Sequence, residues 1–346
     1  MHEGIGMVSL TGEHRGNSSP IERIAVLRAL PGLGDMLCLV PALRALRAAR
    51  PGAHIALIGL PSMRWFAARF AAYVDDLIPF PGWPGLVEQP VEPRRSAAFL
   101  AAMQDSGFDL ALQMHGSGGI TNPLVMLLGA RRAAGFYEPG QYCPDPDAFL
   151  PVPAHTPEPL HHLRLLERLG IPGRGAELEF PITAAERDEA GEAMAVHGLR
   201  PGEFVCVHPG SSTPARRWPL ERFAAVADAL AERGYRIVLT GSNDESPVTH
   251  AVADAMHRPV VDLGGQTSVG GLAALFEAAR LQIANDTGVS HLAAAVRLPS
   301  VLISFSDPAR WAPIDRWRHR PLTDPTPAAV LHQADDLLRM ESCHAA

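Results

Sequence analysis

Short apolar runs alternate with longer amphipathic stretches along most of the chain. In the first half, continuous apolar runs predict strands at residues 24–27, 55–58, 76–79 and 109–112. Apolar side chains repeat at helical spacing in the stretches between them, at residues 35–50, 62–72 and 96–105. Strands that are apolar throughout and alternate with helices indicate a parallel sheet covered on both faces.

A proline-rich stretch at residues 137–159 interrupts this alternation, and a helix is predicted at residues 160–169. A second series follows. Its predicted strands are residues 204–207, 236–239, 260–263, 281–284 and 301–303. Its predicted helices are residues 184–197, 220–233, 247–256, 270–279 and 288–296. A second proline- and glycine-rich stretch separates the two series, so we place an interdomain linker near residues 172–182.

We therefore predict an α/β protein with two Rossmann-like, doubly wound domains that face a central cleft. The predicted divisions are a flexible extension (1–20), a first domain (21–175), a second domain (183–325) and a C-terminal helix and tail (326–346). Ligands of such sheets bind at the carboxyl ends of the strands, and a cleft between two domains is the default binding site.

Charge and composition exclude several classes of protein. The 346 residues contain 30 basic side chains, all of them arginine, against 37 acidic ones, for a net charge of −7. Without lysine, neither Schiff-base chemistry nor a P-loop lysine is available. The acidic balance argues against nucleic-acid binding, which requires a basic surface.

The cysteines and the apolar runs bear on location. The four cysteines are far apart and form no C-x-x-C pair, so a zinc ribbon, a redox motif and a disulfide framework are not expected. No apolar run approaches the roughly 20 residues that span a bilayer, and residues 1–20 lack a secretory apolar core. These features predict a cytoplasmic protein.

The loop after the first predicted strand contains Gly32, Gly34 and Asp35. Glycines allow the backbone to approach a ligand closely, and the helix that follows offers free N–H groups. The loop is neither a G-x-G-x-x-G motif nor a P-loop. Asp35 is either an ordinary N-cap or a general base that faces the site.

A second loop, residues 208–219, combines small hydroxyl side chains with paired arginines before a helix. Ser211, Ser212 and the adjacent Arg216 and Arg217 could form a cradle for an anion, since a guanidinium binds phosphate with two hydrogen bonds. The alternative is a capped turn with two solvated arginines.

A third loop, residues 285–288, joins a predicted strand to a helix rich in small residues. Thr287, Gly288 and the helix N-terminus could meet a diphosphate beside Asp286. The turn could also be a simple cap. His291, on the same helix, is expected to be structural rather than a proton-transfer group.

Taken together, these motifs resemble glycosyltransferase family 9, the family of the ADP-heptose:lipopolysaccharide heptosyltransferases. The resemblance extends from about Ile21 to Pro313 and involves the Gly34-Asp35 loop with residues 41–44, and the segments 208–219, 262–268, 286–292 and 307–311.

The resemblance implies a GT-B fold, with the acceptor on the first domain and a nucleotide-sugar donor on the second. It implies inversion of configuration without a metal or other cofactor. Asp35 matches the family's catalytic base, and Arg216 takes the place of a phosphate-binding lysine. Glu245 is the candidate for the ribose hydroxyls. We assign donor and phosphate binding to Ser211, Ser212, Arg216, Asp286, Thr287, Gly288 and His291, and the glycine loop to Gly32 and Gly34.

Two segments depart from the family pattern. Pro31 and Gly32 replace the usual serines, which leaves the sugar's identity open, and residues 304–307 replace the usual Phe-Gly-Pro-Thr segment. The expected function is transfer of a heptose-type sugar to an acceptor hydroxyl on lipopolysaccharide core or a related glycan. The alternatives are an epimerase or hydrolase on the same fold, or a non-catalytic nucleotide-sugar-binding protein. The expected partners are the donor and a glycan or lipid-linked acceptor, with peripheral contact at the inner face of the cytoplasmic membrane.

Overall fold

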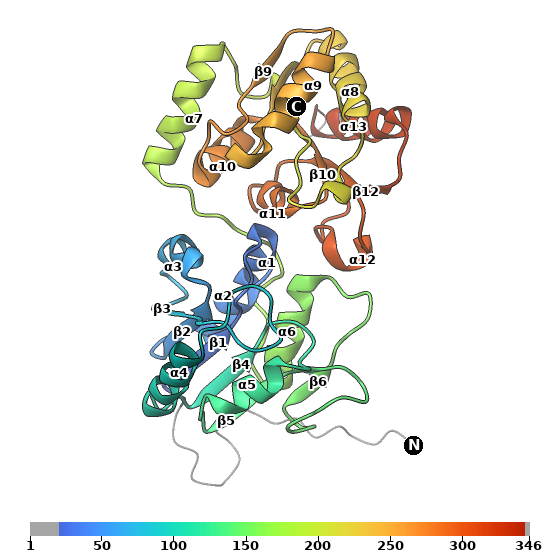
Figure 1. Ribbon diagram of the computed structural model, residues 1–346. Helices are drawn as coiled ribbons and strands as arrows, with labels where there is room; N and C mark the ends of the chain where they lie inside the picture. The colour runs from blue at the N-terminus through green and yellow to red at the C-terminus, as the bar shows by residue number, and fades with distance from the viewer. Residues whose placement is uncertain (1–20, 343–346) are drawn as a thin grey trace. The chain divides into compact units, whose positions relative to one another are not determined.

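The structure is a computed structural model that describes residues 21–342, so the extension predicted at residues 1–20 lies outside it. The chain divides between Ala176 and Glu177 into two compact units, each of which contains one sheet (Figure 1). Within the described ranges, no helix is both long and apolar enough to span a membrane.

The first unit is built on a six-stranded parallel sheet with the order β3-β2-β1-β4-β5-β6. Its strands are β1 (Arg23–Leu27), β2 (His54–Gly59), β3 (Asp76–Pro79), β4 (Leu110–Gln113), β5 (Arg132–Tyr137) and β6 (Phe149–Pro151). The side chains of β4 and most of those of β1 and β2 are buried, because helices cover both faces of a doubly wound sheet.

The helices of the first unit follow the predicted order with one division. Residues 35–50 form two helices rather than one, since Pro41 lacks an N–H group and is favoured in the first turn of a new helix. The helices are α1 (Leu33–Leu37), α2 (Val40–Ala49), η1 (Pro61–Met63), α3 (Arg64–Arg69), α4 (Pro93–Asp105), α5 (Thr121–Leu127) and α6 (Glu158–Arg168).

The second unit repeats this topology in a parallel sheet with the order β12-β11-β10-β7-β8-β9. Its strands are β7 (Phe204–His208), β8 (Arg236–Leu239), β9 (Val260–Asp262), β10 (Leu281–Asn285), β11 (Ser300–Ser304) and β12 (His319–Thr323). The prediction of two doubly wound α/β units is confirmed.

The helices of the second unit begin at recognisable caps. Thr183 and Glu186 form a reciprocal capping box at the start of α7, which has the predicted bounds. The helices are α7 (Ala184–His197), η2 (Pro214–Arg216), α8 (Leu220–Glu232), η3 (Asn243–Glu245), α9 (Ser246–Ala255), α10 (Val269–Ala278), α11 (Gly288–Ala295), α12 (Pro308–Trp311) and α13 (Pro327–Ser342).

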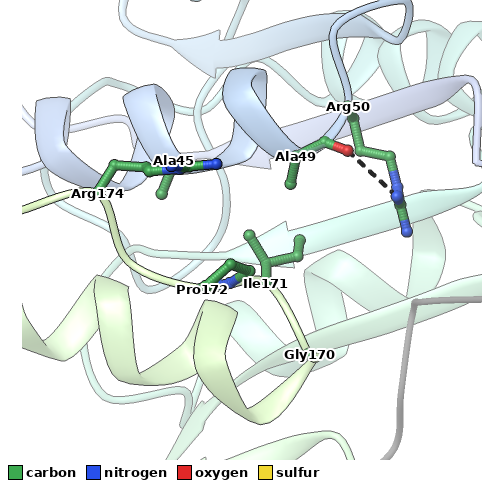
Figure 2. A pocket seen from close by; sticks show the side chains of 7 residues that line it. All are labelled: Ala45, Ala49, Arg50, Gly170, Ile171, Pro172 and Arg174. Atoms are coloured by element: carbon green, nitrogen blue, oxygen red, sulfur yellow. Dashed lines mark hydrogen bonds between the residues drawn. The ribbon is translucent and has the colours of Figure 1, made fainter.

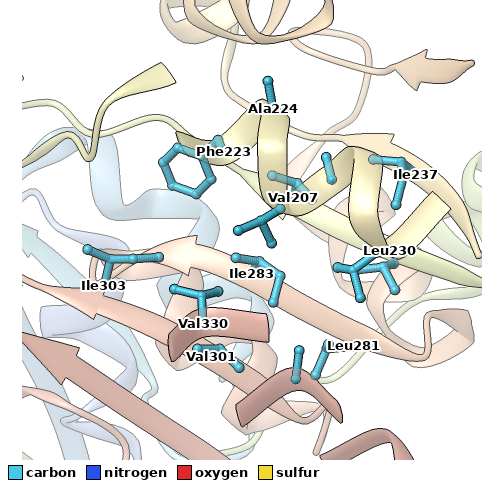
Figure 3. Close-up of a cluster of buried hydrophobic side chains, with 14 of the residues drawn as sticks. Val207, Phe223, Ala224, Leu230, Ile237, Leu281, Ile283, Val301, Ile303 and Val330 are labelled. Carbon is cyan, nitrogen blue, oxygen red and sulfur yellow. The ribbon is translucent and has the colours of Figure 1, made fainter. Parts of the chain in front are cut away.

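The core of the second unit lies between its sheet and the helices α8 and α13 (Figure 3). Val207, Ile283 and Val301 project from three neighbouring strands toward Phe223 of α8 and Val330 of α13. All five are fully buried, and each contributes about 1.5–3 kcal/mol by leaving water. Helix α13 is therefore part of the packed second unit.

The strands β5, β6 and β12 were not predicted. Two of them, β6 and β12, are edge strands that contain a proline, Pro151 and Pro321, and an edge strand tolerates proline because one side of its backbone is unpaired. In β5, Gly135 interrupts the apolar pattern. A Cβ there would lie 2.6 Å from the Cβ of Gln113, so the glycine lets β4 and β5 pack.

Both sheets reverse their strand order beside their first strand. β1 lies between β2 and β4, and β7 lies between β8 and β10. In a doubly wound sheet, the loops that follow the two strands at this reversal lead to opposite faces of the sheet. The reversal is called the switch point, and ligands bind there, at the carboxyl ends of the strands. The three predicted site loops all lie at these two points.

Candidate functional site

At the switch point of the first unit, Asp35 lies in the first turn of α1. Gly32 is the N-cap residue of that helix, so the N-cap interpretation of Asp35 is wrong. The Asp35 side chain is 29% exposed. A Cβ at Gly32 would overlap its Oδ2 atom, so only glycine leaves the carboxylate in this position. Gly34 is buried within α1.

A buried arginine fixes the turn that carries Asp35. Arg28, which follows β1 and is 1% exposed, donates from Nε to the Asp35 carbonyl at 3.0 Å and from Nη1 to the Met114 carbonyl at 2.6 Å. Its Nη2 lies 3.7 Å from Asp35 Oδ1 and 3.3 Å from Glu158 Oε1. One guanidinium thus joins the ends of β1 and β4 to the starts of α1 and α6.

Sequence reasoning missed the Arg28–Glu158 pair, because 130 residues separate its members. Glu158 is itself buried, with His161 Nδ1 at 3.5 Å and His162 Nε2 at 3.8 Å. The only signal in the sequence is a charged residue, Glu158, between two prolines at the end of the proline-rich stretch. That signal does not name its partner.

His115 lies on the other side of the same switch point, after β4. The Ala29 N–H donates to its Nδ1 at 3.0 Å, so the neutral ring carries its proton on Nε2, 3.4 Å from Glu88 Oε1. Burial lowers the pKa of His115, against the opposing effect of Glu88. The lowered pKa favours the neutral ring beside the Arg28 cation, and Asp35, at 29%, is more exposed than Glu88 or Glu158.

In the second unit, the order β10-β7-β8 places three loops side by side at the carboxyl edge. Ala284 of β10 is paired in register with His208 of β7, so the 285–288 turn and the 208–219 loop start next to each other. The loop after β8 leads to Glu245 on the other side of β7. The structure thus brings the predicted donor residues to one edge of the sheet.

The 208–219 loop separates its two arginines into different roles. Arg217 donates from Nε and Nη2 to the Ser211 carbonyl at 2.9 and 2.7 Å, so it stabilises the loop. Arg216 ends η2 with an exposed side chain. Ser211 is buried and its Oγ accepts the Thr213 N–H, whereas Ser212 is exposed. Ser212, Thr213 and Arg216 are the exposed polar side chains of this loop and can meet a ligand.

Glu245 lies against the start of the same loop. Its Oε2 accepts hydrogen bonds from the Ser242 N–H and hydroxyl, both at 2.9 Å, and lies 3.5 Å from His208 Nε2. Burial alone would raise the pKa of Glu245, but His208 and Ser242 outweigh it and hold the pKa at about 2. A Cβ at Gly210 would overlap this carboxylate. Glu245 is therefore a fixed anion at the start of the 208–219 loop.

The 285–288 turn leads directly into α11. Thr287 is its N-cap residue, and the Thr287 N–H donates to Ser290 Oγ at 3.2 Å. Gly288 opens the helix, and Asp286 is half-buried, with its Oδ2 accepting the Ser304 hydroxyl at 3.0 Å. His291 is buried inside the unit, and its assignment to donor binding stays a prediction.

A buried histidine at the amino-terminal edge of the same sheet, opposite this turn, makes stability depend on pH. Burial lowers the pKa of His319 to about 4, and its Nδ1 lies 2.8 Å from Ser300 Oγ. The unfolded state binds this proton near pH 6.5, so the stabilisation is present above pH 6.5 and is lost as pH falls toward 4. The free energy of unfolding should fall by about 3 kcal/mol over this range from His319.

Urea titrations at several pH values measure this effect. A His319→Gln variant, which cannot titrate, should show a smaller loss between pH 6.5 and 4 than the unmodified protein. His332→Gln serves as the control, because that side chain is 70% exposed. Equal pH dependence in the unmodified and His319→Gln proteins would refute the assignment.

A pocket of about 190 Å³ lies elsewhere in the first unit (Figure 2). It is lined by Ala45, Ala49, Arg50, Gly170, Ile171, Pro172 and Arg174. These residues come from the carboxyl-terminal part of α2 and the segment after α6, and no predicted site residue lines the pocket. Within residues 21–342, no group of three or more His, Cys, Asp or Glu side chains is arranged to hold a metal ion.

Comparison with known sequences identifies a family. The model of glycosyltransferase family 9 (heptosyltransferase) matches residues 154–326, half of the 346 residues. Lipooligosaccharide heptosyltransferase 2 of Haemophilus ducreyi is 29% identical over 143 residues, which are 38% of this chain and 40% of that protein. The matched part therefore spans about two fifths of that relative's length.

Solved structures match over nearly the whole chain. A glycosyl transferase of family 9 from Veillonella parvula has a TM-score of 0.75 at 22% identity, and 93% of this chain aligns with 99% of it. The ADP-heptose lps heptosyltransferase II of E. coli has a TM-score of 0.70 at 21% identity, with the same shares of both chains. At these identities the likeness establishes a common fold.

Proposed function

The chain belongs to glycosyltransferase family 9, and from this premise we propose that it transfers a heptose-type sugar from a nucleotide-diphosphate sugar to an acceptor hydroxyl. The acceptor is lipopolysaccharide core or a related glycan. The reaction inverts the anomeric configuration and uses no metal or other cofactor, and the preferred donor is of the ADP-heptose type. Because such an acceptor is lipid-linked, we propose that the protein acts peripherally at the inner face of the cytoplasmic membrane.

One observation carries this proposal: a partly exposed carboxylate, Asp35, is held at the switch point of the first sheet. A sugar hydroxyl is a weak nucleophile at neutral pH, and a positioned base that removes its proton in the transition state accelerates attack. Gly32 leaves room for the carboxylate, and Arg28 fixes the backbone that carries it. The proton of the acceptor hydroxyl moves to Asp35 as the oxygen attacks the anomeric carbon.

The second unit supplies what the leaving group needs. The nucleoside diphosphate departs with increasing negative charge, which N–H donors and a cation stabilise. Arg216 is an exposed cation on the loop beside α11, and the first N–H groups of α11 add the positive end of a helix dipole. Glu245, held as an anion beside this loop, is the proposed acceptor of a hydrogen bond from a ribose hydroxyl.

A turnover assay with the full chain tests this function. ADP-heptose is incubated with heptose-deficient lipopolysaccharide core, with and without EDTA, and ADP release, product mass and the anomeric NMR signals are followed. ADP release that requires the acceptor, gives the inverted anomer and is insensitive to EDTA is the expected result. Donor consumption without acceptor would instead identify a hydrolase or epimerase, and donor binding without turnover a binding protein.

Replacing Arg216 with alanine should lower kcat/KM for the donor by about 10²-fold, because one cation at a departing diphosphate is lost. Arg216→Lys should retain more of the activity, since it keeps the charge but loses the planar fork. Steady-state kinetics with varied donor measure both. Arg200→Ala is the matched control, because Arg200 is exposed before β7, at the opposite edge of the sheet. Unchanged donor kinetics in Arg216→Ala would rule out this role.

A further inference from the structure

Asn285, the last residue of β10, is a completely buried polar side chain at the donor edge. Its Nδ2 donates to the Pro209 carbonyl at 2.7 Å and to the Gly210 carbonyl at 3.3 Å. Its Oδ1 accepts the Trp218 N–H at 3.1 Å. Both donors and one acceptor of a single amide are thus used by the neighbouring loop.

These contacts hold the two ends of the loop that carries Arg216. Pro209 and Gly210 lie at its beginning and Trp218 lies at its end. The hydrogen bonds of Asn285 therefore tie the two ends of the loop together. Trp218 is further fixed by its Nε1 donating to the Pro325 carbonyl at 3.2 Å. The exposed Arg216 is therefore carried on a segment anchored at both ends.

Asn285 is also the first residue of the turn that leads into α11. A movement of this amide would shift the loop of Arg216 relative to Thr287 and Gly288. An aspartate of the same shape could still accept the Trp218 N–H, but it would face two carbonyl oxygens without a proton to donate. Only an amide of this size satisfies all three partners.

We propose that Asn285 is a positioning residue for the donor diphosphate. It holds the Arg216 loop and the N-terminus of α11 in one fixed arrangement, so that both reach the same diphosphate group. Preorganised donors stabilise charge without reorganising when it develops. This inference rests on the proposed function, since it assumes that a nucleoside diphosphate binds at this edge.

Calorimetric binding of ADP and of adenosine to the full chain tests the proposal without requiring turnover. In Asn285→Asp, ADP affinity should fall about tenfold or more, while adenosine affinity changes little, because adenosine has no phosphate to position. Ile283→Ala on the same strand is the control. It should lower the Tm but leave the ratio of ADP to adenosine affinity unchanged. Asn285→Ser, which is smaller and uncharged, replaces the aspartate variant if that one does not fold.

The outcomes separate this inference from the function on which it rests. An unchanged ratio of ADP to adenosine affinity in a folded Asn285 variant would overturn the positioning role of Asn285. It would not contradict the proposed transferase function. Failure of the unmodified protein to bind ADP, or GDP, UDP and TDP as alternatives, would overturn the proposed function itself. A loss of ADP affinity without a loss of adenosine affinity supports the positioning role, since a loss of stability alone would weaken the binding of both ligands.

Discussion

Replacing Asp35 with asparagine is expected to lower kcat for sugar transfer by about 10²–10⁴-fold, the contribution typical of a general base. The substitution preserves the size of the side chain and removes the carboxylate that we propose takes the acceptor's proton. The contacts that carry this carboxylate, Gly32 and Arg28, belong to the first unit, so ADP affinity should remain within about twofold. Initial rates at saturating donor and acceptor, with calorimetry for ADP, measure the two quantities.

Asp105→Asn is the matched control for this prediction. Asp105 is an exposed carboxylate at the end of α4 in the same unit, so its loss should leave kcat unchanged. If Asp35→Asn retained kcat within about threefold of the unmodified protein, Asp35 would not be the base. A parallel loss of ADP affinity would instead indicate that the substitution disturbs donor binding.

Replacing Arg28 with methionine should reduce the free energy of unfolding of the first unit by about 3–5 kcal/mol, the usual cost of removing one partner of a buried ion pair. The substitution leaves Glu158 buried without its guanidinium partner and frees the carbonyls of Asp35 and Met114. Urea denaturation followed by circular dichroism measures the loss.

The double variant Arg28→Met with Glu158→Gln should recover part of this stability, because it also removes the buried negative charge that has lost its guanidinium partner. Arg95→Met provides the comparison within the same unit. Arg95 and Glu92 form an ion pair with both side chains more than half exposed, and such pairs contribute about 0–1 kcal/mol. Equal effects of Arg28→Met and Arg95→Met would show that burial of the first pair has no energetic consequence.

Much of the fold could be predicted from local pattern. The run at residues 76–79 and the stretch at residues 184–197 have the bounds of β3 and α7. Signals that act over a few positions set these bounds: a short apolar run for β3, and the capping residues Thr183, Glu186 and Gly198 for α7. The edge strands β6 and β12 were missed for the opposite reason. Their prolines break the pattern, and only their place at the edge of a sheet makes them tolerable.

The loops of the candidate site could be predicted from the sequence, but the hydrogen bonds and ion pairs that hold these loops could not. Glycine, serine and arginine after an apolar run mark residues 32–35 and 208–219, since such residues are favoured where backbone and cation meet an anion. The bonds from Arg28 to Glu158 and from Asn285 to Pro209 join positions 130 and 76 residues apart. No short-range rule pairs them, because they exist only once the strands are ordered side by side.

The division between Ala176 and Glu177 bears on how the two units can evolve. The contacts that hold Asp35 come from the unit before this boundary, and those that hold the Arg216 loop come from the unit after it. Each half therefore contains the contacts that support its own loop, and the segment that connects the halves has no regular secondary structure. Under the proposed function, gene recombination at this segment would replace the donor half and leave the proposed proton acceptor, Asp35, in its own scaffold.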